Sequence, residues 1–195
     1  MRVLFVAHRY DYGRPERGLS FEHYNFYEPL VALGHDVDFL DIGEPVRAGR
    51  PDLVDEQLVD AVRRVAPDLV FTFLYADEIS PEAIASVTAS GVPTLNWFAD
   101  DHWRFETFSA RYAPSYSFVA TTAESALPKY AAIGCTGVIK TQWAAAHHRY
   151  APSAEGLRFD ATFVGQVYGD RPMLVQALRE AGVDVRTWGT GWAER

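Results

Sequence analysis

The chain has 195 residues, enough for one large domain or for one full domain and part of another. Hydrophobic residues make up 48% of it and charged residues 23%, as in ordinary globular proteins, and no segment approaches the run of about 20 apolar residues that spans a bilayer. The net charge of −8, without a basic tract, argues against a nucleic-acid partner, while the one cysteine, Cys135, excludes an intrachain disulfide and favours a cytoplasmic protein.

Strand and helix signals alternate along the first part of the chain. Short apolar runs of the kind buried in parallel sheets predict strands at residues 2–8, 36–41, 68–75, 93–98, 116–122 and 137–143. Helices are predicted from near Ser20 to before Gly34, at about 52–66, from Ser80 to Gly91, and over a segment ending near Gly134. This rhythm predicts an α/β fold, a Rossmann-like parallel sheet with helices on both faces. Pro29 should kink or split the first helix.

A second unit is predicted to begin near residue 150, after a polar connection. It contains strand signals at 160–165 and 183–189 and, between them, a helix with Pro172 at its first position. We therefore divide the chain into a first domain, 1–150, and the start of a second, 151–195. Two strands do not bury a core alone, so we expect a chain truncated relative to a longer protein, or an end that packs on a partner.

Ligands of open parallel sheets bind beyond the carboxyl ends of the strands, so the first strand's loop is a candidate site. The loop combines a histidine with three arginines and two glycines, which would let the backbone approach a ligand closely. An exposed polar loop explains the same composition equally well. No GxGxxG pattern follows the strand, which argues against an NAD-dependent enzyme. The candidate residues in this loop are His8, Tyr12, Gly13, Arg17 and Gly18.

The third predicted strand is followed by the sequence YADE. Asp77 or Glu78 could bind a substrate hydroxyl there. A solvated turn that leads into the helix cap at Ser80 is the simpler interpretation of both carboxylates.

The fourth predicted strand ends in NWFADDHWRF, the densest mixture of charged and aromatic residues in the chain. Asp100, Asp101 or His102 could act as the general base that takes a proton from an attacking hydroxyl, with His8 as a rival. Alternatively, the two aspartates only cap a short helix that follows. One carboxylate could also form the cap and leave the other for chemistry.

The aromatic residues of the same stretch also allow two interpretations. Trp97, Trp103 and Arg104 are candidate substrate contacts. Packing of Trp97 and Trp103 in the core, together with Phe98 and Phe105, would explain the aromatics without a ligand.

The sixth predicted strand ends in two adjacent histidines, His147 and His148. Neighbouring side chains point in different directions on a helix or strand, so a metal site is not expected. We predict that His147 lines a cleft or belongs to a hinge. Cys135, next to a helix end, is interpreted as a small buried residue and not as a nucleophile.

Three stretches resemble the CgeB-like (spore-maturation-type) glycosyltransferases, which have the GT-B fold. They are DYGRPERGLSFEHYNFYEPL, TLNWFADDHWRFETFS, and QWAAAHHRYAP followed by DATFVGQVYGDR. The resemblance implies two Rossmann-like domains, with the acceptor held by the first and most of the nucleotide-sugar donor by the second. It also implies chemistry without a metal or a cofactor, and it places Gly165, Gly169 and Arg171 near the donor phosphates. A solvated residue at a helix start is the alternative for Arg171.

The predicted function is transfer of a sugar from a nucleotide-sugar donor to an unidentified acceptor. The chain would be an N-terminal fragment of such an enzyme, and its activity alone stays open, as does a homo-oligomer. The main alternative is a Rossmann-like binding or assembly module that has lost transfer activity.

Overall fold

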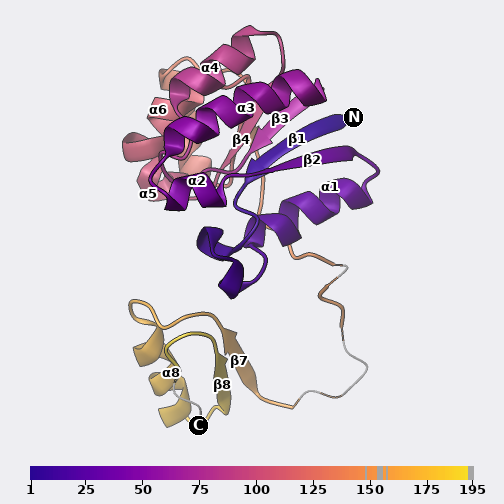
Figure 1. The fold of residues 1–195 in the computed structure, drawn as a ribbon. Coiled ribbons are helices and arrows are strands. Elements are labelled where there is room, and N and C mark those ends of the chain that lie inside the picture. The colour runs from indigo at the N-terminus through magenta and orange to yellow at the C-terminus, as the bar shows by residue number, and fades with distance from the viewer. Residues whose placement is uncertain (148, 153–155, 157, 193–195) are drawn as a thin grey trace. The chain divides into compact units, whose positions relative to one another are not determined.

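The computed structural model describes residues 1–147, 149–152, 156 and 158–192 (Figure 1). The chain divides into two compact units, Met1–Tyr150 and Ala151–Arg195. Each unit is an α/β structure, so the predicted fold class is confirmed. The acceptor and donor roles predicted for the two parts stay predictions. Among the described residues, no helix combines the length and apolar character needed to cross a membrane.

The first unit is built on a six-stranded sheet in which all neighbouring strands are parallel. The strands lie in the order β2-β1-β3-β4-β5-β6. Each one falls inside a segment predicted from its apolar run: β1 (Arg2–Ala7), β2 (Asp36–Asp41), β3 (Leu69–Thr72), β4 (Thr94–Phe98), β5 (Phe118–Thr121) and β6 (Val138–Lys140).

Helices cover both faces of this sheet (Figure 1). One face carries α1 (Glu28–Ala32), and α3 (Pro51–Val65) and α4 (Pro81–Ala89) lie on the other. A separate apolar core lies under each layer because side chains alternate between faces along a strand. Phe5 of β1 packs in the core on the α1 side, whereas Leu4 packs in the core on the α3 side.

The helix before β2 starts where its cap signal predicts. The Ser20 hydroxyl accepts a hydrogen bond from His23 N at 3.0 Å and donates one to the His8 carbonyl at 2.6 Å. The helix is not split at Pro29. Instead a wide π-helical turn, His23–Tyr27, precedes α1, and Pro29 lies in the first turn of α1. Such a turn accommodates the missing proline N–H.

Among the described residues, four further α-helices belong to the first unit. The predicted short helix after β4 forms as α5 (Asp101–Arg104), but the chain stays helical beyond it, through a π-helical turn into α6 (Ala110–Tyr112). Helix α7 (Leu127–Ala132) precedes β6. A helix that the sequence analysis does not predict, α2 (Gly43–Arg47), follows β2.

The second unit has two parallel strands and one helix. Strands β7 (Ala161–Val164) and β8 (Val185–Trp188) pair, and α8 (Arg171–Glu180) connects them. Its side chains are mostly exposed, and Val175 and Val185 are its buried hydrophobic residues within the described part of the chain.

Candidate functional site

The strand order places a topological switch between β1 and β3. The chain leaves β1 toward α1 on one face and leaves β3 toward α4 on the other, although β1 and β3 are paired neighbours. Loops that diverge in this way leave the carboxyl ends of the two strands open to a ligand. The residues just beyond Ala7 and Thr72 are therefore the first to consider.

His8 and Glu78 meet at this switch point. His8 directly follows β1 and is 8% exposed, and Glu78, from the loop after β3, is 4% exposed. His8 Nε2 lies 3.7 Å from Glu78 Oε1. Glu78 is held in place because its two carboxylate oxygens accept hydrogen bonds from Tyr75 N at 3.1 Å and Ala76 N at 2.7 Å. The arrangement is a buried histidine next to a fixed carboxylate.

The other ring nitrogen of His8 faces the loop that follows β1. His8 Nδ1 is buried and has no hydrogen-bond partner within the described residues. A Cβ atom added to Gly13 would lie 3.1 Å from this nitrogen and 3.1 Å from Gly43 Cα. Gly13 also has a φ of +67°, a conformation that side chains disfavour. Gly13 therefore packs closely on protein atoms of His8 and Gly43, and its predicted contact with a ligand stays a prediction.

A second buried carboxylate, Glu22, is bound by the side chain of Tyr75, whose backbone N–H binds Glu78. Glu22 is 2% exposed, and Tyr75 donates a hydrogen bond from its hydroxyl to Glu22 Oε1 at 2.5 Å. Partial burial and the Glu22 carboxylate raise the pKa of Tyr75, so its phenol stays a donor at neutral pH. Arg104, a predicted substrate contact, donates to the Tyr75 carbonyl and stacks on Phe108 at 4.5 Å.

The three polar residues after β4 lie in different environments. Asp101 is 1% exposed and accepts hydrogen bonds from the hydroxyls of Ser109 and Tyr130, the latter at 2.7 Å. Burial and the Asp101 charge raise the pKa of Tyr130, which keeps this donor protonated. Asp100 is the N-cap residue of α5, but its carboxylate makes no cap hydrogen bond within the described chain, and His102 is exposed. Asp101 thus ties α5 to the π-helical turn Phe105–Ser109 and to α7, while Asp100 and His102 remain more accessible.

The predicted substrate contacts around these residues are spread over the same edge. Asp77 is exposed and pairs with Arg111, and it also accepts from the Tyr112 hydroxyl at 3.1 Å. Trp103 is 62% exposed, in contrast to the core packing that was one interpretation of it. Trp97 is half-buried against Phe26, with ring centroids 4.9 Å apart.

In the loop after β1, Arg17 interacts with residues of the same loop. Arg17 pairs with Asp11 at 3.0 Å and lies 4.9 Å from the centre of the exposed Tyr12 ring. Tyr12 has a φ of 50°, an uncommon value for a residue with a side chain. Gly18 also has a positive φ and would meet nothing if it carried a Cβ atom, so its conformation, and not a close contact, favours glycine there.

The segment after β6 packs on other parts of the first unit, to which it belongs. Trp143 contacts the rings of Phe21 and Trp97 at 5.5 and 5.7 Å. Arg149 lies 3.6 Å from the Tyr24 ring centre. His147 is exposed, and its predicted role at a cleft or hinge stays a prediction, while His148 lies outside the described residues. Within those residues no group of three or more His, Cys, Asp and Glu side chains is arranged to hold a metal ion.

Of the residues predicted to approach donor phosphates, Gly165 and Gly169 lie in the loop between β7 and α8, and Arg171 begins α8. The Arg171 side chain donates to the Gln166 carbonyl at 3.1 Å, so it is folded back on this loop. Gly165 lies against Gly189, since a Cβ atom on Gly189 would be 2.3 Å from the Gly165 carbonyl oxygen. Gly169 has a positive φ of 52°. A role in phosphate binding stays a prediction for all three residues.

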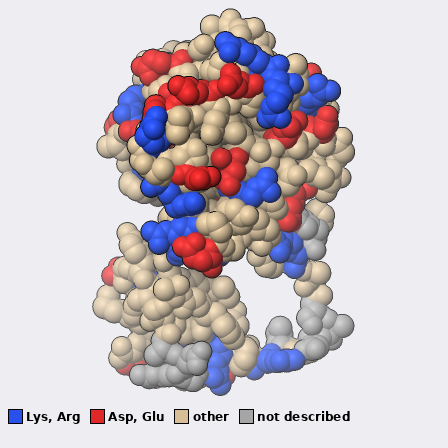
Figure 2. Space-filling model, in the orientation of Figure 1, with Lys and Arg blue, Asp and Glu red and all other residues tan. Residues whose placement is uncertain are grey.

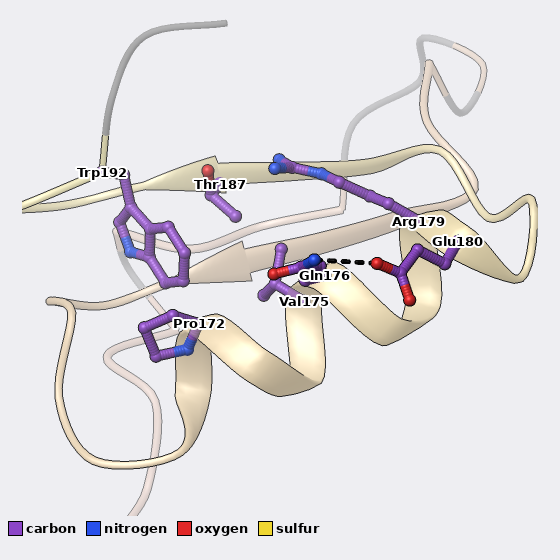
Figure 3. Close-up of a pocket in the computed structure, with 7 residues that line it drawn as sticks. All are labelled: Pro172, Val175, Gln176, Arg179, Glu180, Thr187 and Trp192. Atoms are coloured by element: carbon purple, nitrogen blue, oxygen red, sulfur yellow. Dashed lines mark hydrogen bonds between the residues drawn. The ribbon is translucent and has the colours of Figure 1, made fainter.

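The second unit also has a hollow of about 530 Å³ beside α8 and β8. Figure 3 shows Pro172 and Trp192 at one end of it and Glu180, hydrogen-bonded to Gln176, toward the other. Arg179, which also lines the hollow, donates to the Val185 carbonyl through two nitrogens, at 3.1 and 2.8 Å. The walls are therefore fixed by contacts within the unit.

On the face shown in Figure 2, acidic and basic side chains are interspersed. This distribution agrees with the absence of a basic tract from the sequence.

Sequence reasoning missed Glu22, and it named Glu78 only as an alternative to Asp77 for binding a substrate hydroxyl. Glu22 begins a helical turn whose next turn carries the buried Phe26, and an acid on the buried face of a helix is a signal that could have been used. Nothing in YADE distinguishes Glu78 from Asp77, because a loop has no fixed side-chain periodicity.

No protein-family model matches the chain, and no curated protein matches it. Among solved structures, the UDP-N-acetylglucosamine 2-epimerase from Rickettsia bellii has a TM-score of 0.57 at 12% identity, over 97% of this chain and 68% of that one. A protein assigned as a UDP-N-acetylglucosamine 2-epimerase from Listeria monocytogenes has a TM-score of 0.58 at 13% identity, over 96% and 61%. The lipopolysaccharide outer core galactosyltransferase WaaB has a TM-score of 0.48 at 12% identity, over 97% and 69%.

The comparisons with the two epimerase structures establish the architecture. The likeness to the two epimerase structures shows a Rossmann-like fold of the GT-B type. The chain spans 68% and 61% of the length of those two proteins.

Proposed function

We propose that the chain is the acceptor-side part of a CgeB-like glycosyltransferase that moves a sugar from a nucleotide-sugar donor to an acceptor hydroxyl. The observation that carries the proposal is the buried His8–Glu78 pair at the topological switch of the sheet. Ligands of this class of sheet bind at that point, and a histidine is the side chain best suited to accept a proton near neutral pH.

In the proposed reaction the acceptor oxygen forms a bond to the anomeric carbon of the donor sugar. The bond between that carbon and the phosphate oxygen breaks, and the nucleotide leaves with the electron pair. His8 takes the proton of the acceptor hydroxyl, and Glu78 stabilises the imidazolium that results. His8 Nδ1 lies behind Gly13, so the Tyr12–Gly13 turn must shift before an acceptor reaches this nitrogen.

The geometry favours His8 over the other candidate bases. Both oxygens of Asp101 already accept hydrogen bonds from hydroxyls, and removing them would break a buried network. Asp100 and His102 are more accessible, but each lacks a fixed partner of the kind that Glu78 provides for His8 within the described residues. Asp101 is therefore assigned a structural role in this proposal.

On the donor side, the proposal gives Gly165, Gly169 and Arg171 a place near the donor phosphates. Support comes from their position between the carboxyl end of β7 and the first turn of α8, which Arg171 begins. Arg171 would need to leave the Gln166 carbonyl to bind a phosphate. The reaction needs no cofactor beyond the nucleotide sugar itself, and we propose a cytoplasmic enzyme.

The proposal is tested on the natural protein that carries this chain. A panel of UDP, GDP, ADP and TDP sugars is incubated with the protein, and released nucleotide is measured by chromatography while the sugar is followed by NMR. Release of a nucleotide with the sugar transferred to an acceptor or to water supports the proposal. The His8→Phe variant should abolish this release.

Two outcomes would overturn the proposal. Change of the sugar without release of nucleotide would identify an isomerising enzyme. Binding of a nucleotide sugar without any turnover across the panel would identify a binding module.

A further inference from the structure

Residues 11–18, which follow β1, form a segment that buries very little of itself. Of these residues, all of which the structure describes, only Gly13 is buried. The Tyr12 ring is 69% exposed, and Asp11 and Arg17 pair with each other inside the segment. A segment with few buried contacts can detach from a fold without global unfolding. We call residues 11–18 the lid segment.

Gly13 is the residue through which the lid segment closes over His8. A Cβ atom on Gly13 would lie 3.1 Å from His8 Nδ1 and 3.1 Å from Gly43 Cα. Gly43 is held in place, because its N–H donates to Asp41 Oδ1 at 2.9 Å. Gly13 therefore lies between an imidazole and a fixed backbone, with no room there for a side chain.

The closed position is unfavourable in two respects. His8 Nδ1 is buried and has no hydrogen-bond partner in the described part of the chain. A buried polar atom without a partner is destabilising, and contact with water would restore its hydrogen bond. Tyr12 has a φ of 50°, which is a strained value for a residue with a side chain. A movement of the Tyr12–Gly13 turn away from His8 would relieve the first of these penalties directly.

The base of the lid segment is firmly paired. Tyr10 and Leu19 form an antiparallel bridge, and Ser20 N donates to the Arg9 carbonyl at 2.9 Å. The Ser20 hydroxyl also donates to the His8 carbonyl at 2.6 Å. These contacts hold the backbone of His8 independently of the lid segment. The segment can therefore move while His8 keeps its place at the end of β1.

We propose that residues 11–18 act as a lid that opens and closes over His8, with Gly13 as the part that seals the imidazole. This structure shows the closed state, in which Nδ1 is shielded. In the open state Nδ1 meets water or the hydroxyl of a ligand. The opening concerns this chain alone, whereas its use to admit an acceptor rests on the proposed transferase function.

Hydrogen exchange of the natural protein, followed by mass spectrometry, tests whether the lid opens by itself. We expect the amides of residues 11–18 to exchange by local opening, at a rate that low concentrations of urea leave unchanged. The amides of β1 should exchange only through larger unfolding, which urea accelerates. Exchange of the lid segment at the rate of β1, with the same urea dependence, would overturn the proposal.

A second measurement links the opening to His8. Diethyl pyrocarbonate acylates accessible imidazoles, and peptide mass spectrometry follows the reaction at each histidine. In the wild type, His8 should react more slowly than the exposed His102. In Gly13→Ala the added Cβ atom opposes the closed state, so His8 should react about tenfold faster than in the wild type. Gly49→Ala is the matched control, because Gly49 has nearly the same φ and open space around its Cβ position, and it should stay within about twofold of the wild type.

A shortened lid keeps the test decisive if Gly13→Ala does not fold. Asp11 N donates to the Gly18 carbonyl at 3.0 Å, so a two-residue Asn-Gly turn can replace residues 12–17 between them. His8 should then react as fast as His102. A wild-type rate at His8 in the shortened protein, or in a folded Gly13→Ala protein, would overturn the proposal. A lid that opens in a protein that transfers no sugar would instead refute the transferase proposal and leave the lid standing.

Discussion

Nε2 of His8 lies 3.7 Å from Oε1 of Glu78, although the two residues follow different strands of the sheet. The parallel pairing of β1 with β3, in which Val6 is opposite Thr72, brings the ends of both strands to one edge. Two backbone N–H groups then fix the Glu78 carboxylate. The loops after β1 and β3 therefore place a histidine next to a fixed carboxylate.

Replacing Glu78 should separate positioning from substrate binding. In Glu78→Gln the neutral amide no longer stabilises a protonated His8, so turnover should fall about a hundredfold with little change in KM. The matched control is Asp77→Asn, because Asp77 is exposed and pairs with Arg111, and it should keep turnover within about twofold. Steady-state kinetics across pH check both. Equal effects of the two variants would contradict the positioning role.

Asp101 should contribute to stability. Asp101→Ala leaves the buried hydroxyls of Ser109 and Tyr130 without an acceptor, which should lower the free energy of unfolding by about 2–4 kcal/mol. Asp100→Ala is the control, since the Asp100 carboxylate makes no cap hydrogen bond among the described residues, and it should cost less than about 0.5 kcal/mol. Urea unfolding measures both values. A stable Asp101→Ala protein without activity would instead favour Asp101 as the base.

Replacing Gly13 by alanine should lower stability through backbone strain and through close contacts, and Gly49 allows the two effects to be separated. Gly13 and Gly49 have nearly equal φ values, +67° and +68°, but an added Cβ atom meets Gly43 and His8 only at Gly13 and meets nothing at Gly49. Gly49→Ala should cost about 1–2 kcal/mol from backbone strain. Gly13→Ala should cost about 1–3 kcal/mol more, because the contacts at 3.1 Å must be relieved. Equal losses in thermal or urea unfolding would mean that the turn moves freely.

Protonation of His23 should lower the free energy of unfolding on mild acidification. Desolvation by burial lowers the pKa of His23, opposed by Glu28 and assisted by Arg9 and Arg149. Between the unfolded pKa of about 6.5 and the lower folded pKa, the unfolded chain binds more protons. The free energy of unfolding is therefore highest above about pH 6.5 and falls as the pH decreases from there to the folded pKa of His23.

The matching variant is His23→Phe, which keeps an aromatic ring against Tyr27 and Phe39. Its melting temperature should decline less than that of the wild type between about pH 7 and pH 5. Parallel curves for the two proteins would show that His23 does not titrate abnormally.

The sequence predicts the sheet well because its strands are short apolar runs and Ser20 and Ser80 mark helix starts. Both serines do form caps, since each hydroxyl accepts a backbone hydrogen bond. The π-helical turn before Pro29 was not predictable. The missing N–H of Pro29 predicts an irregularity in the helix, but not whether the helix kinks, breaks or widens. The site was harder still. The sequence nominates His8, but its pairing with Glu78 depends on the strand order, which a single sequence does not reveal.

The burial of Asp101 illustrates the same limit. Adjacent aspartates are equivalent in the sequence, and only the packing of the π-helical turn Phe105–Ser109 and of α7 decides that Asp101 meets Ser109 and Tyr130. The aromatic residues around them divide in the same way: Phe98 and Phe105 are buried, whereas Trp103 is exposed.

The most direct test of the central claim compares two histidine variants of the natural protein. His8→Gln and His102→Gln are assayed with the donor that the nucleotide-sugar panel identifies, and kcat/KM is measured for each. Loss of a general base typically lowers the rate by about 10²–10⁴-fold, so His8→Gln should fall in this range while the exposed His102→Gln stays within about twofold of wild type. Wild-type kcat/KM in His8→Gln would contradict the account.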